Sequence, residues 1–228
     1  MITMKDVHKT YANGVTALNG IDIHIRPGEF VYVVGPSGAG KSTFVKLIYR
    51  EAKPTSGEII INDINVSNIK EKKVPYLRRQ IGVIFQDFKL LPKLTTYENV
   101  AFALEVIEES PRNIRRKVMD VLDLVGLKNK ARFLPGELSG GEQQRVAIAR
   151  AIVNSPKIVI ADEPTGNLDP DTSWEIMRVF EEINARGTTV IMATHSKEIV
   201  NAIKKRVIAV EDGLIVRDEQ QGEYGYEI

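Results

Sequence analysis

One short stretch constrains the fold of this chain more than any other. Residues 35–43 read Gly-Pro-Ser-Gly-Ala-Gly-Lys-Ser-Thr and fit the phosphate-binding pattern G-x-x-x-x-G-K-[ST]. The apolar run Phe30–Val34 before it predicts a buried strand, and the apolar spacing after it predicts a helix that ends before Pro54. An ordinary glycine-rich turn is the alternative, but such a turn needs neither the strand nor the helix. The sequence therefore predicts a strand–loop–helix unit that binds phosphate groups.

Each residue type in this loop has a physical reason. Glycines let the backbone turn so that successive N–H groups point at phosphate oxygens. The helix that follows adds the positive end of its dipole. Lys41 supplies a point charge for the β- and γ-phosphates, and the Ser42 hydroxyl is a suitable Mg²⁺ ligand. The loop therefore predicts binding of a nucleoside triphosphate together with Mg²⁺.

A second glycine motif lies far downstream. Residues 138–143 read Leu-Ser-Gly-Gly-Glu-Gln and precede a helical pattern over Gln144–Val153. Ser139 and Glu142 fit an S-x-x-E capping box, which alone explains why a helix begins here. A cap does not need two glycines, however, and these leave the first N–H groups of the helix open to a ligand oxygen. We interpret the stretch as a helix start that also binds a ligand.

Together, the two motifs resemble those of the ABC-type ATPases, whose signature is LSGGQ-like and here reads LSGGEQ. The resemblance covers nearly the whole chain, from Met4 to about Asp218, with no departure at any motif position. It implies a single α/β domain of the ABC P-loop type. Residues 1–86 and 154–228 would form a RecA-like core with an antiparallel β subdomain at its edge. Residues 87–153 would form a helical subdomain that carries the signature motif.

A strand with two terminal carboxylates resembles the Walker B motif of this family. It is the apolar run Ile158–Glu163. Asp162 at the strand end can hold Mg²⁺ through its water shell, and Glu163, one residue on, points elsewhere and can polarise the attacking water. A lone carboxylate here would read as a solvated loop acid. The run Gly166–Asp169 that follows matches the D-loop of the family and favours the functional interpretation.

Three further residues match single positions of the family pattern. His195 follows the apolar strand Val190–Ala193 and matches the switch histidine, although a lone histidine is more often structural. Gln86 matches the Q-loop glutamine that reaches Mg²⁺ and the attacking water. Tyr11 matches the aromatic residue that stacks on adenine, and simple packing is its alternative.

The resemblance therefore implies an ATP and Mg²⁺ site with divided roles. Glu163, His195 and Gln86 would be catalytic, and Ser42, Gln86 and Asp162 would hold the metal ion. The nucleotide contacts would come from a larger set: Tyr11, Gly35, Pro36, Ser37, Gly38, Ala39, Gly40, Lys41, Ser42, Thr43, Gln86, Ser139, Gly140, Gly141, Glu142, Asp162, Asp169 and His195. In the family the signature of a second chain covers the γ-phosphate, so the resemblance also implies a homodimer that forms on ATP binding.

The amino-acid composition limits which partners the protein can bind and which cellular compartment suits it. Lys and Arg number 31 against 30 Asp and Glu, a net charge of +1, which gives no electrostatic case for nucleic-acid binding. There is no cysteine, which excludes thiol chemistry and zinc–thiolate sites. No apolar run approaches the ~20 residues that span a bilayer, and the N-terminus lacks a signal peptide's apolar stretch. We expect a soluble, cytoplasmic protein that reaches the membrane through a partner.

The order of elements agrees with the implied fold. Residues 2–34 read as strands, with turns at two glycines, and residues 57–66 read as a further strand pair. Residues 95–153 are mostly helical by their apolar periodicity. From residue 157 on, strands and helices alternate, which is typical of a parallel sheet.

Other stretches resemble one branch of small ABC ATPases. Thr165–Asp169 and Met192–His195 resemble a branch that serves cell division, lipoprotein release (LolD) and MacB-type export. Within it, Val74–Gly82 and the tail from Arg217 to Tyr226 resemble the cell-division members. The resemblance then implies control of peptidoglycan hydrolases through an integral membrane subunit. A LolD- or MacB-type ATPase and a nucleotide-dependent clamp with negligible turnover are the alternatives, and intact Glu163 argues against the clamp.

The apolar loop after Gln86 is the expected docking place of the membrane subunit. Phe88, Leu90 and Leu91 lie where relatives dock a cytoplasmic helix of that subunit, and exposed apolar patches often mark partner sites. The alternative is that these three side chains simply pack the core of the helical subdomain. Their exposure in the folded chain distinguishes the two interpretations.

Overall fold

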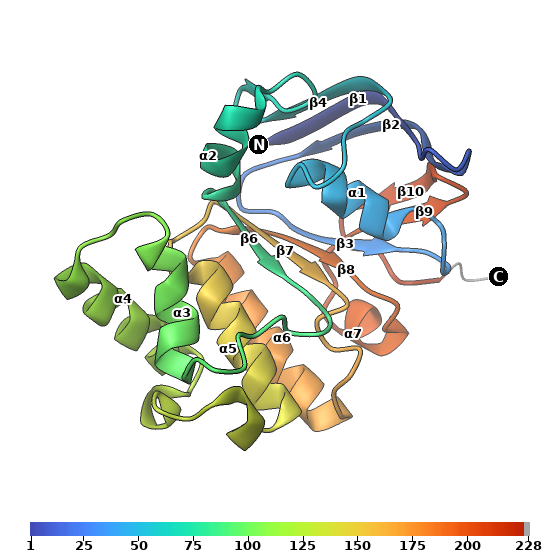
Figure 1. Ribbon diagram of the computed structural model, residues 1–228. Helices are drawn as coiled ribbons and strands as arrows, with labels where there is room; N and C mark the ends of the chain where they lie inside the picture. The colour runs from blue at the N-terminus through green and yellow to red at the C-terminus, as the bar shows by residue number, and fades with distance from the viewer. Residues whose placement is uncertain (226–228) are drawn as a thin grey trace.

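The computed structural model describes residues 1–225 and shows two sheets flanked by helices (Figure 1). Tyr226, which belongs to the tail that resembles the cell-division members, lies outside the described residues, as do the two residues after it. The antiparallel sheet has the strand order β2-β1-β4-β5. Its strands are β1 (Ile2–Thr10), β2 (Thr16–Ile25), β4 (Ser56–Ile61) and β5 (Ile64–Asn65). The predicted strands in 2–34 and the strand pair in 57–66 are confirmed.

The second sheet is parallel except for one edge strand. Its order is β10-β9-β3-β8-β7-β6, and only β10 runs antiparallel to its neighbour. Each strand is short and mostly apolar, as expected for strands buried on both faces. The strands are β3 (Phe30–Val34), β6 (Ile81–Ile84), β7 (Ile158–Asp162), β8 (Thr189–Ala193), β9 (Arg206–Glu211) and β10 (Leu214–Glu219).

Helices cover both faces of this sheet, α1 on one side and α5 and α6 on the other (Figure 1). No helix among residues 1–225 has both the length and the apolar character needed to cross a membrane. The α-helices are α1 (Lys41–Ile48), α2 (Val74–Arg78), α3 (Thr96–Glu105), α4 (Pro111–Leu124), α5 (Gly140–Ile152), α6 (Pro170–Ala185) and α7 (Lys197–Ala202). Single 3₁₀ turns occupy Glu71–Lys73, Lys128–Lys130 and Pro135–Glu137.

Strand β3 shows how the two cores are divided. Its side chains alternate between the sheet faces, because successive residues of a strand point to opposite sides. Phe30, Tyr32 and Val34 pack with helices α3 to α7, whereas Val31 and Val33 pack with α1 and the antiparallel sheet. The strand that leads into the phosphate loop is therefore fully buried on both faces, which fixes the position of the loop.

Helix α5 begins earlier than the periodicity predicts. It starts at Gly140, four residues before Gln144, because the capping box sets its first turn. The Ser139 hydroxyl accepts from the Glu142 amide at 3.3 Å, and the Glu142 carboxylate accepts from the Ser139 amide at 3.0 Å. The capping box read from the sequence is therefore present, and it places both signature glycines inside the helix.

Candidate functional site

Four loops meet at one edge of the parallel sheet. They follow β3, β8, β7 and β6, which are neighbours in that order. Ligands of open α/β sheets bind outside the carboxyl ends of the strands. The loops carry the phosphate loop 35–43, then His195, then Asp162 with Glu163, and finally Gln86. The fold therefore brings together predicted site residues that lie far apart in the sequence.

Glycine is sterically required at both ends of the phosphate loop. Gly35 has a φ of 141°, and a Cβ there would lie 2.0 Å from the Val210 carbonyl oxygen. Gly40 has a φ of 110°, and a Cβ would lie 2.4 Å from the Ala17 carbonyl oxygen. Any side chain would therefore push the loop off both the parallel and the antiparallel sheet. The loop keeps its shape through these close backbone contacts.

Lys41 lies folded over the start of the loop. Its ammonium group donates to the Gly35 carbonyl at 2.7 Å and to the Pro36 carbonyl at 2.9 Å. These two carbonyls hold the charged ammonium group of Lys41 at the loop. A bound phosphate can replace the neutral carbonyls as the acceptor, and only a local movement of the lysine side chain is needed.

Asp162 at the end of β7 lies close to the phosphate loop. Burial and the Glu163 carboxylate raise the pKa of Asp162, an effect that the Ser42 hydroxyl, Lys46 and Lys41 counteract. No group of three or more His, Cys, Asp or Glu side chains gathers as a metal centre among residues 1–225. Mg²⁺ is commonly held by one or two protein oxygens together with substrate phosphates. One hydroxyl and one half-buried carboxylate fit such an ion.

Glu163 and His195 form a pair across two neighbouring strand ends. Glu163 has a φ of 50°, unusual for a residue other than glycine, which turns it away from the line of β7. Its carboxylate accepts from the His195 amide at 3.2 Å and lies 2.8 Å from His195 Nδ1. The carboxylate is 17% exposed and the imidazole 66%. The pair is thus anchored in the fold and open to solvent on one side.

Gln86 contacts the D-loop. Its side-chain amide donates to the Asn167 side chain at 3.4 Å, and the Asn167 amide donates back to the Gln86 carbonyl at 3.3 Å. A Cβ at Gly166 would lie 3.1 Å from the Gln86 side chain, so glycine allows this contact. The loop after β6 is therefore tied to the loop after β7. The predicted role of Gln86 toward Mg²⁺ and water stays a prediction.

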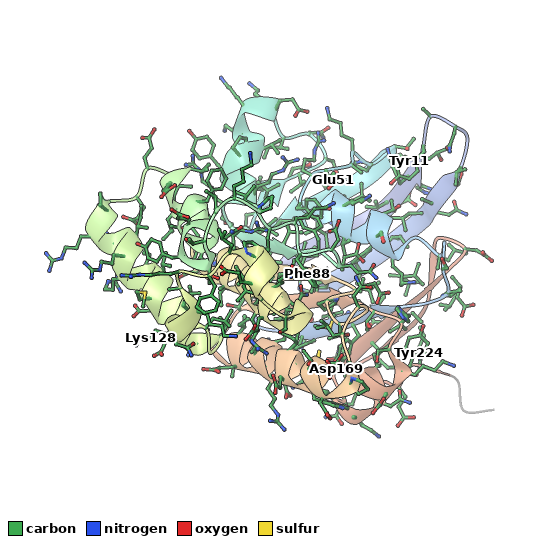
Figure 2. All side chains as sticks on the ribbon, turned by 60° about the horizontal axis from the view of Figure 1, so that its bottom comes forward. Tyr11, Glu51, Phe88, Lys128, Asp169 and Tyr224 are labelled. Atoms are coloured by element: carbon green, nitrogen blue, oxygen red, sulfur yellow. The ribbon has the colours of Figure 1, made fainter. Side chains whose placement is uncertain are left out.

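Asp169 caps helix α6. Its carboxylate accepts from the Thr172 amide at 2.9 Å, and the hydrogen bonds from Thr172 lower the pKa of Asp169. Pro170 follows at the first helical position, so Asp-Pro is a helix-start signal that the sequence already carried. Figure 2 labels Asp169 at this helix start. Its predicted role toward nucleotide in a dimer stays open, since the carboxylate is exposed.

The two signature glycines differ in their surroundings. A Cβ at Gly141 would lie 2.2 Å from Thr172 Cγ2, so this glycine lets α5 approach α6. A Cβ at Gly140 would meet only Leu168, at an ordinary 3.6 Å. Figure 1 shows the start of α5 well away from the turn between β3 and α1. Within one chain, the signature and the phosphate loop therefore do not face the same ligand.

Tyr11 lies over the start of helix α1. Its hydroxyl is 3.1 Å from the Thr43 hydroxyl, and the Lys9 ammonium lies 4.8 Å from its ring centroid. Figure 2 labels this tyrosine on the side of the antiparallel sheet. Its position beside the phosphate loop suits an adenine ring, and the stacking itself stays a prediction.

A buried glutamine joins the signature helix to the catalytic loop. Gln144, fully buried, donates to the Pro164 carbonyl at 2.7 Å, one residue past Glu163. Gln144 was not predicted as a site residue. It is a polar side chain at a position of α5 that the apolar periodicity places in the core, and a buried amide needs a hydrogen-bond partner, so its position could have indicated this contact.

The loop after Gln86 is less exposed than expected. Phe88, Leu90 and Leu91 are half-buried, and Leu90 packs against the core of the helices. Arg150 donates to the carbonyls of Phe88 and the next residue at 2.9 and 2.7 Å, and Asn99 holds both backbone groups of Leu91. The expected contiguous apolar patch is therefore only partly exposed, because Arg150 and the buried Asn99 hold the loop against helices α5 and α3.

Exposed apolar side chains lie next to this loop instead. Phe102 and Val106 on α3 are 45% and 59% exposed. They line a groove of about 450 Å³ between α3 and α2, floored by β6 and bordered by Arg150. Arg150 thus connects the groove to the loop that follows Gln86.

Comparison with known proteins defines the class. The family model described as "ABC transporter" matches residues 18–166. A dimeric structure of the ATP-binding cassette MJ0796, in a post-hydrolysis state bound to ADP and Pi, superimposes with a TM-score of 0.87 at 38% identity, covering 99% of this chain and 100% of that one. CbiO1 of Clostridium perfringens gives a TM-score of 0.90 at 31% identity, covering 96% and 88%. The protein is an ABC-type ATPase, as predicted.

Curated relatives show to which family of ABC-type ATPases the chain belongs. The chain is 72% identical over 225 residues to the cell division ATP-binding protein FtsE of Bacillus subtilis (strain 168), covering 99% of each chain. It is 63% identical over 227 residues to FtsE of Streptococcus pneumoniae (strain D39), covering 100% and 99%, and 48% identical over 213 residues to FtsE of Escherichia coli (strain K12), covering 93% and 96%. The chain therefore belongs to the FtsE family of cell division ATP-binding proteins, and the alternative of a LolD- or MacB-type ATPase is set aside.

Proposed function

We propose that this ATPase works as the nucleotide-driven subunit of an FtsEX complex. ATP binding brings two copies together, the dimer acts on the integral membrane protein FtsX, and FtsX controls peptidoglycan hydrolysis during division. The protein then lies in the cytoplasm, held at the inner face of the membrane by its partner. The observation that carries the proposal is the anchored Glu163–His195 pair beside an intact phosphate loop, which favours turnover over a passive clamp.

The residues of the site divide the work of phosphoryl transfer. The loop amides and Lys41 hold the phosphates, since catalysis here is mainly positioning and charge neutralisation. Glu163 accepts a proton from, or orients, the attacking water, and His195 holds that carboxylate in place through its amide and imidazole. Ser42 and Asp162 would hold Mg²⁺, and the ion would neutralise charge on the phosphates. Tyr11 would stack on the adenine ring, and Gln86 would reach Mg²⁺ and the attacking water.

The signature motif acts on the nucleotide of the second chain. Within one chain the start of α5 lies away from the phosphate loop, and Gly140 carries no side chain that would block a ligand from the first amides of the helix. The two dimeric MJ0796 structures, at 38% and 39% identity, supply the precedent for such an assembly. The homodimer of this chain holds two ATP molecules, each covered by the partner's signature residues.

FtsX docks near Phe88, Leu90 and Leu91, in the groove lined by Phe102 and Val106. The groove offers exposed apolar surface and is linked to the Gln86 loop through Arg150. Movement of a docked helix is thereby transmitted to the loop that contacts the D-loop. The half-buried state of Leu90 makes the groove residues the better test positions.

Co-purification with FtsX tests this docking assignment. Val106→Glu places a charge in the groove at an already exposed position, and we expect it to abolish co-purification of FtsX while ATP hydrolysis by the free ATPase survives. Leu91→Glu should act in the same way. The matched control is Val216→Glu, at an exposed position on the distant edge strand β10. Parental recovery of FtsX with Val106→Glu and Leu91→Glu would contradict the assignment.

A further inference from the structure

The signature helix begins with an acidic side chain close to its two glycines. Glu142 is the third residue of α5, after Gly140 and Gly141, and it stands where the letters LSGGQ have a neutral glutamine. The positive end of a helix attracts anions, so a carboxylate in the first turn competes with an incoming phosphate for the same place. An uncompensated charge on Glu142 would therefore oppose the approach of a γ-phosphate to this helix start.

Both oxygens of the Glu142 carboxylate have partners within the chain. Oε2 accepts from the Ser139 amide at 3.0 Å, and Oε1 accepts from the Lys130 ammonium at 2.5 Å. The Glu142 side chain is 16% exposed and that of Lys130 31%, so the pair is partly shielded from solvent. Arg145 also acts on Glu142, but its guanidinium pairs with Glu175 on α6 at 2.9 Å. Lys130 is therefore the cation that directly balances the charge of Glu142.

The backbone around Lys130 is held in place by its neighbours. Lys130 ends the 3₁₀ turn Lys128–Lys130, where its amide donates to the Leu127 carbonyl at 2.9 Å. Its carbonyl accepts from the Phe133 amide at 3.0 Å, and its ammonium lies 5.6 Å from the Phe133 ring centroid. The Phe133 carbonyl in turn accepts from the Thr96 amide, at the start of α3, at 2.7 Å. Lys130 thus reaches the signature helix from an anchored segment.

We propose that Lys130 is a positioning residue that neutralises Glu142, so that an acidic signature can cover the γ-phosphate of a second chain. The inference rests on the proposed function, in which α5 acts on the nucleotide of the partner. Glu142 keeps its part in the capping box, while Lys130 balances the charge that the phosphate would otherwise meet. The two ways of breaking the ion pair then have opposite consequences. Loss of Lys130 leaves a bare carboxylate at the helix start, whereas loss of the Glu142 charge leaves a cation there.

The ATP-dependent dimer of the full chain tests this difference. Sedimentation in excess Mg-ATP measures the Kd of the dimer, in chains that also carry Glu163→Gln so that hydrolysis does not separate them. Lys130→Met should weaken the dimer by about 10- to 100-fold, because a like charge then lies close to each γ-phosphate. Glu142→Gln should not weaken it, since glutamine also fits a capping box. Lys130→Met combined with Glu142→Gln should return the dimer to the parental affinity.

The matched control lies in the same 3₁₀ turn. Lys128, labelled in Figure 2, is 57% exposed and pairs with Asp123 at 3.4 Å, so Lys128→Met removes the same charge away from the signature. It should leave the dimer unchanged. The melting temperatures of the nucleotide-free variants should stay near the parental value, because a partly exposed ion pair contributes little to stability.

Two results would overturn the proposal. If Glu142→Gln weakened the dimer as much as Lys130→Met, the ion pair would be a structural tie whose charge is irrelevant. Parental dimerisation of Lys130→Met would show that Glu142 needs no compensation. Failure of the proposed function looks different: no ATP-dependent dimer would form without the Lys130 and Glu142 substitutions, or the dimer would persist with Gly140→Asp.

Discussion

The phosphate loop and the signature start of α5 are both glycine-rich helix N-termini, yet the chain treats them differently. At the phosphate loop, backbone contacts to both sheets require glycine, and a charged side chain is held over the loop. At the signature, a capping box satisfies the amides of Ser139 and Glu142, and a Cβ at Gly140 would meet only Leu168, at 3.6 Å. The first region is complete within one chain. The second has a locally stable helix start, and in the proposed dimer it acts on the nucleotide of a second chain.

The largest effect is expected for Glu163, the proposed catalytic carboxylate at the same edge of the sheet as the phosphate loop. Glu163→Gln keeps the shape and the His195 amide contact but removes the charge next to the water. We expect phosphate release to fall by about 10²- to 10⁴-fold, the usual contribution of a general base, with ATP affinity retained. The variant should also accumulate as an ATP-bound dimer on size exclusion. Glu105→Gln, on an exposed part of α3, is the matched control, and near-parental turnover of Glu163→Gln would remove Glu163 from its assigned role.

Substitution at the signature should block turnover without touching ATP binding by the monomer. Gly140→Asp puts a carboxylate where a γ-phosphate of the second chain would approach, so we expect loss of the ATP-dependent dimer and a fall in turnover of order 100-fold, like other lost transition-state donors. Light scattering and calorimetry measure the two properties. A mixture with Lys41→Ala chains should restore one composite site.

The neighbouring glycine provides the contrast. Gly141→Ala brings a Cβ to 2.2 Å from Thr172 Cγ2, so its main effect should be a lower melting temperature through displacement of α5 from α6. If Gly140→Asp lost ATP binding as a monomer, the signature would act within its own chain and the comparison would fail.

Removal of Lys41 tests whether the phosphate loop binds nucleotide. Lys41→Ala deletes the charge that faces the β- and γ-phosphates, and a charge-assisted hydrogen bond of that kind corresponds to about 10- to 100-fold in affinity. The loss should be greater for ATP than for ADP, because the γ-phosphate also loses a partner. Calorimetry with both nucleotides measures it, with Lys53→Ala as control. Equal ATP affinities of variant and parent would show that the loop does not hold the phosphates.

The smallest expected effect is that of Ser139→Ala, which distinguishes the helix-capping role of Ser139 from its proposed role in nucleotide binding. Ser139→Ala removes an N-cap and should lower the free energy of unfolding by about 1 kcal/mol. Thr95→Ala removes the corresponding cap of α3, where the Thr95 hydroxyl accepts from the Glu98 amide at 3.2 Å, and should cost a similar amount. Denaturant unfolding measures both. Only Ser139→Ala should also reduce ATP-dependent dimerisation; identical dimerisation in the two variants would leave Ser139 with the cap alone.

The catalytic strand ends and the groove show how far sequence could lead. Asp162, Glu163 and His195 were predicted from their match to motif positions of the ABC family at the ends of apolar strands, and parallel strands bring such ends to one edge. Phe88, Leu90 and Leu91 are less exposed than predicted. Apolar residues on a loop carry no local signal of which side faces solvent, and their partial burial depends on Arg150 of α5 and Asn99 of α3, which bind the loop.

The sequence by itself determined the phosphate loop, the strand and helix that flank it, and both capping residues of the signature. These features depend on local backbone sterics, on apolar periodicity and on hydrogen bonds a few residues apart, all of which a linear pattern records. Only the tertiary structure decided that Glu163 pairs with His195, that Gln144 reaches the Pro164 carbonyl, and that Tyr224 lines a pocket together with Gly35. Those contacts join residues from separate elements, and they arise because the packing of α5, α7 and β10 on the parallel sheet brings the groups within reach.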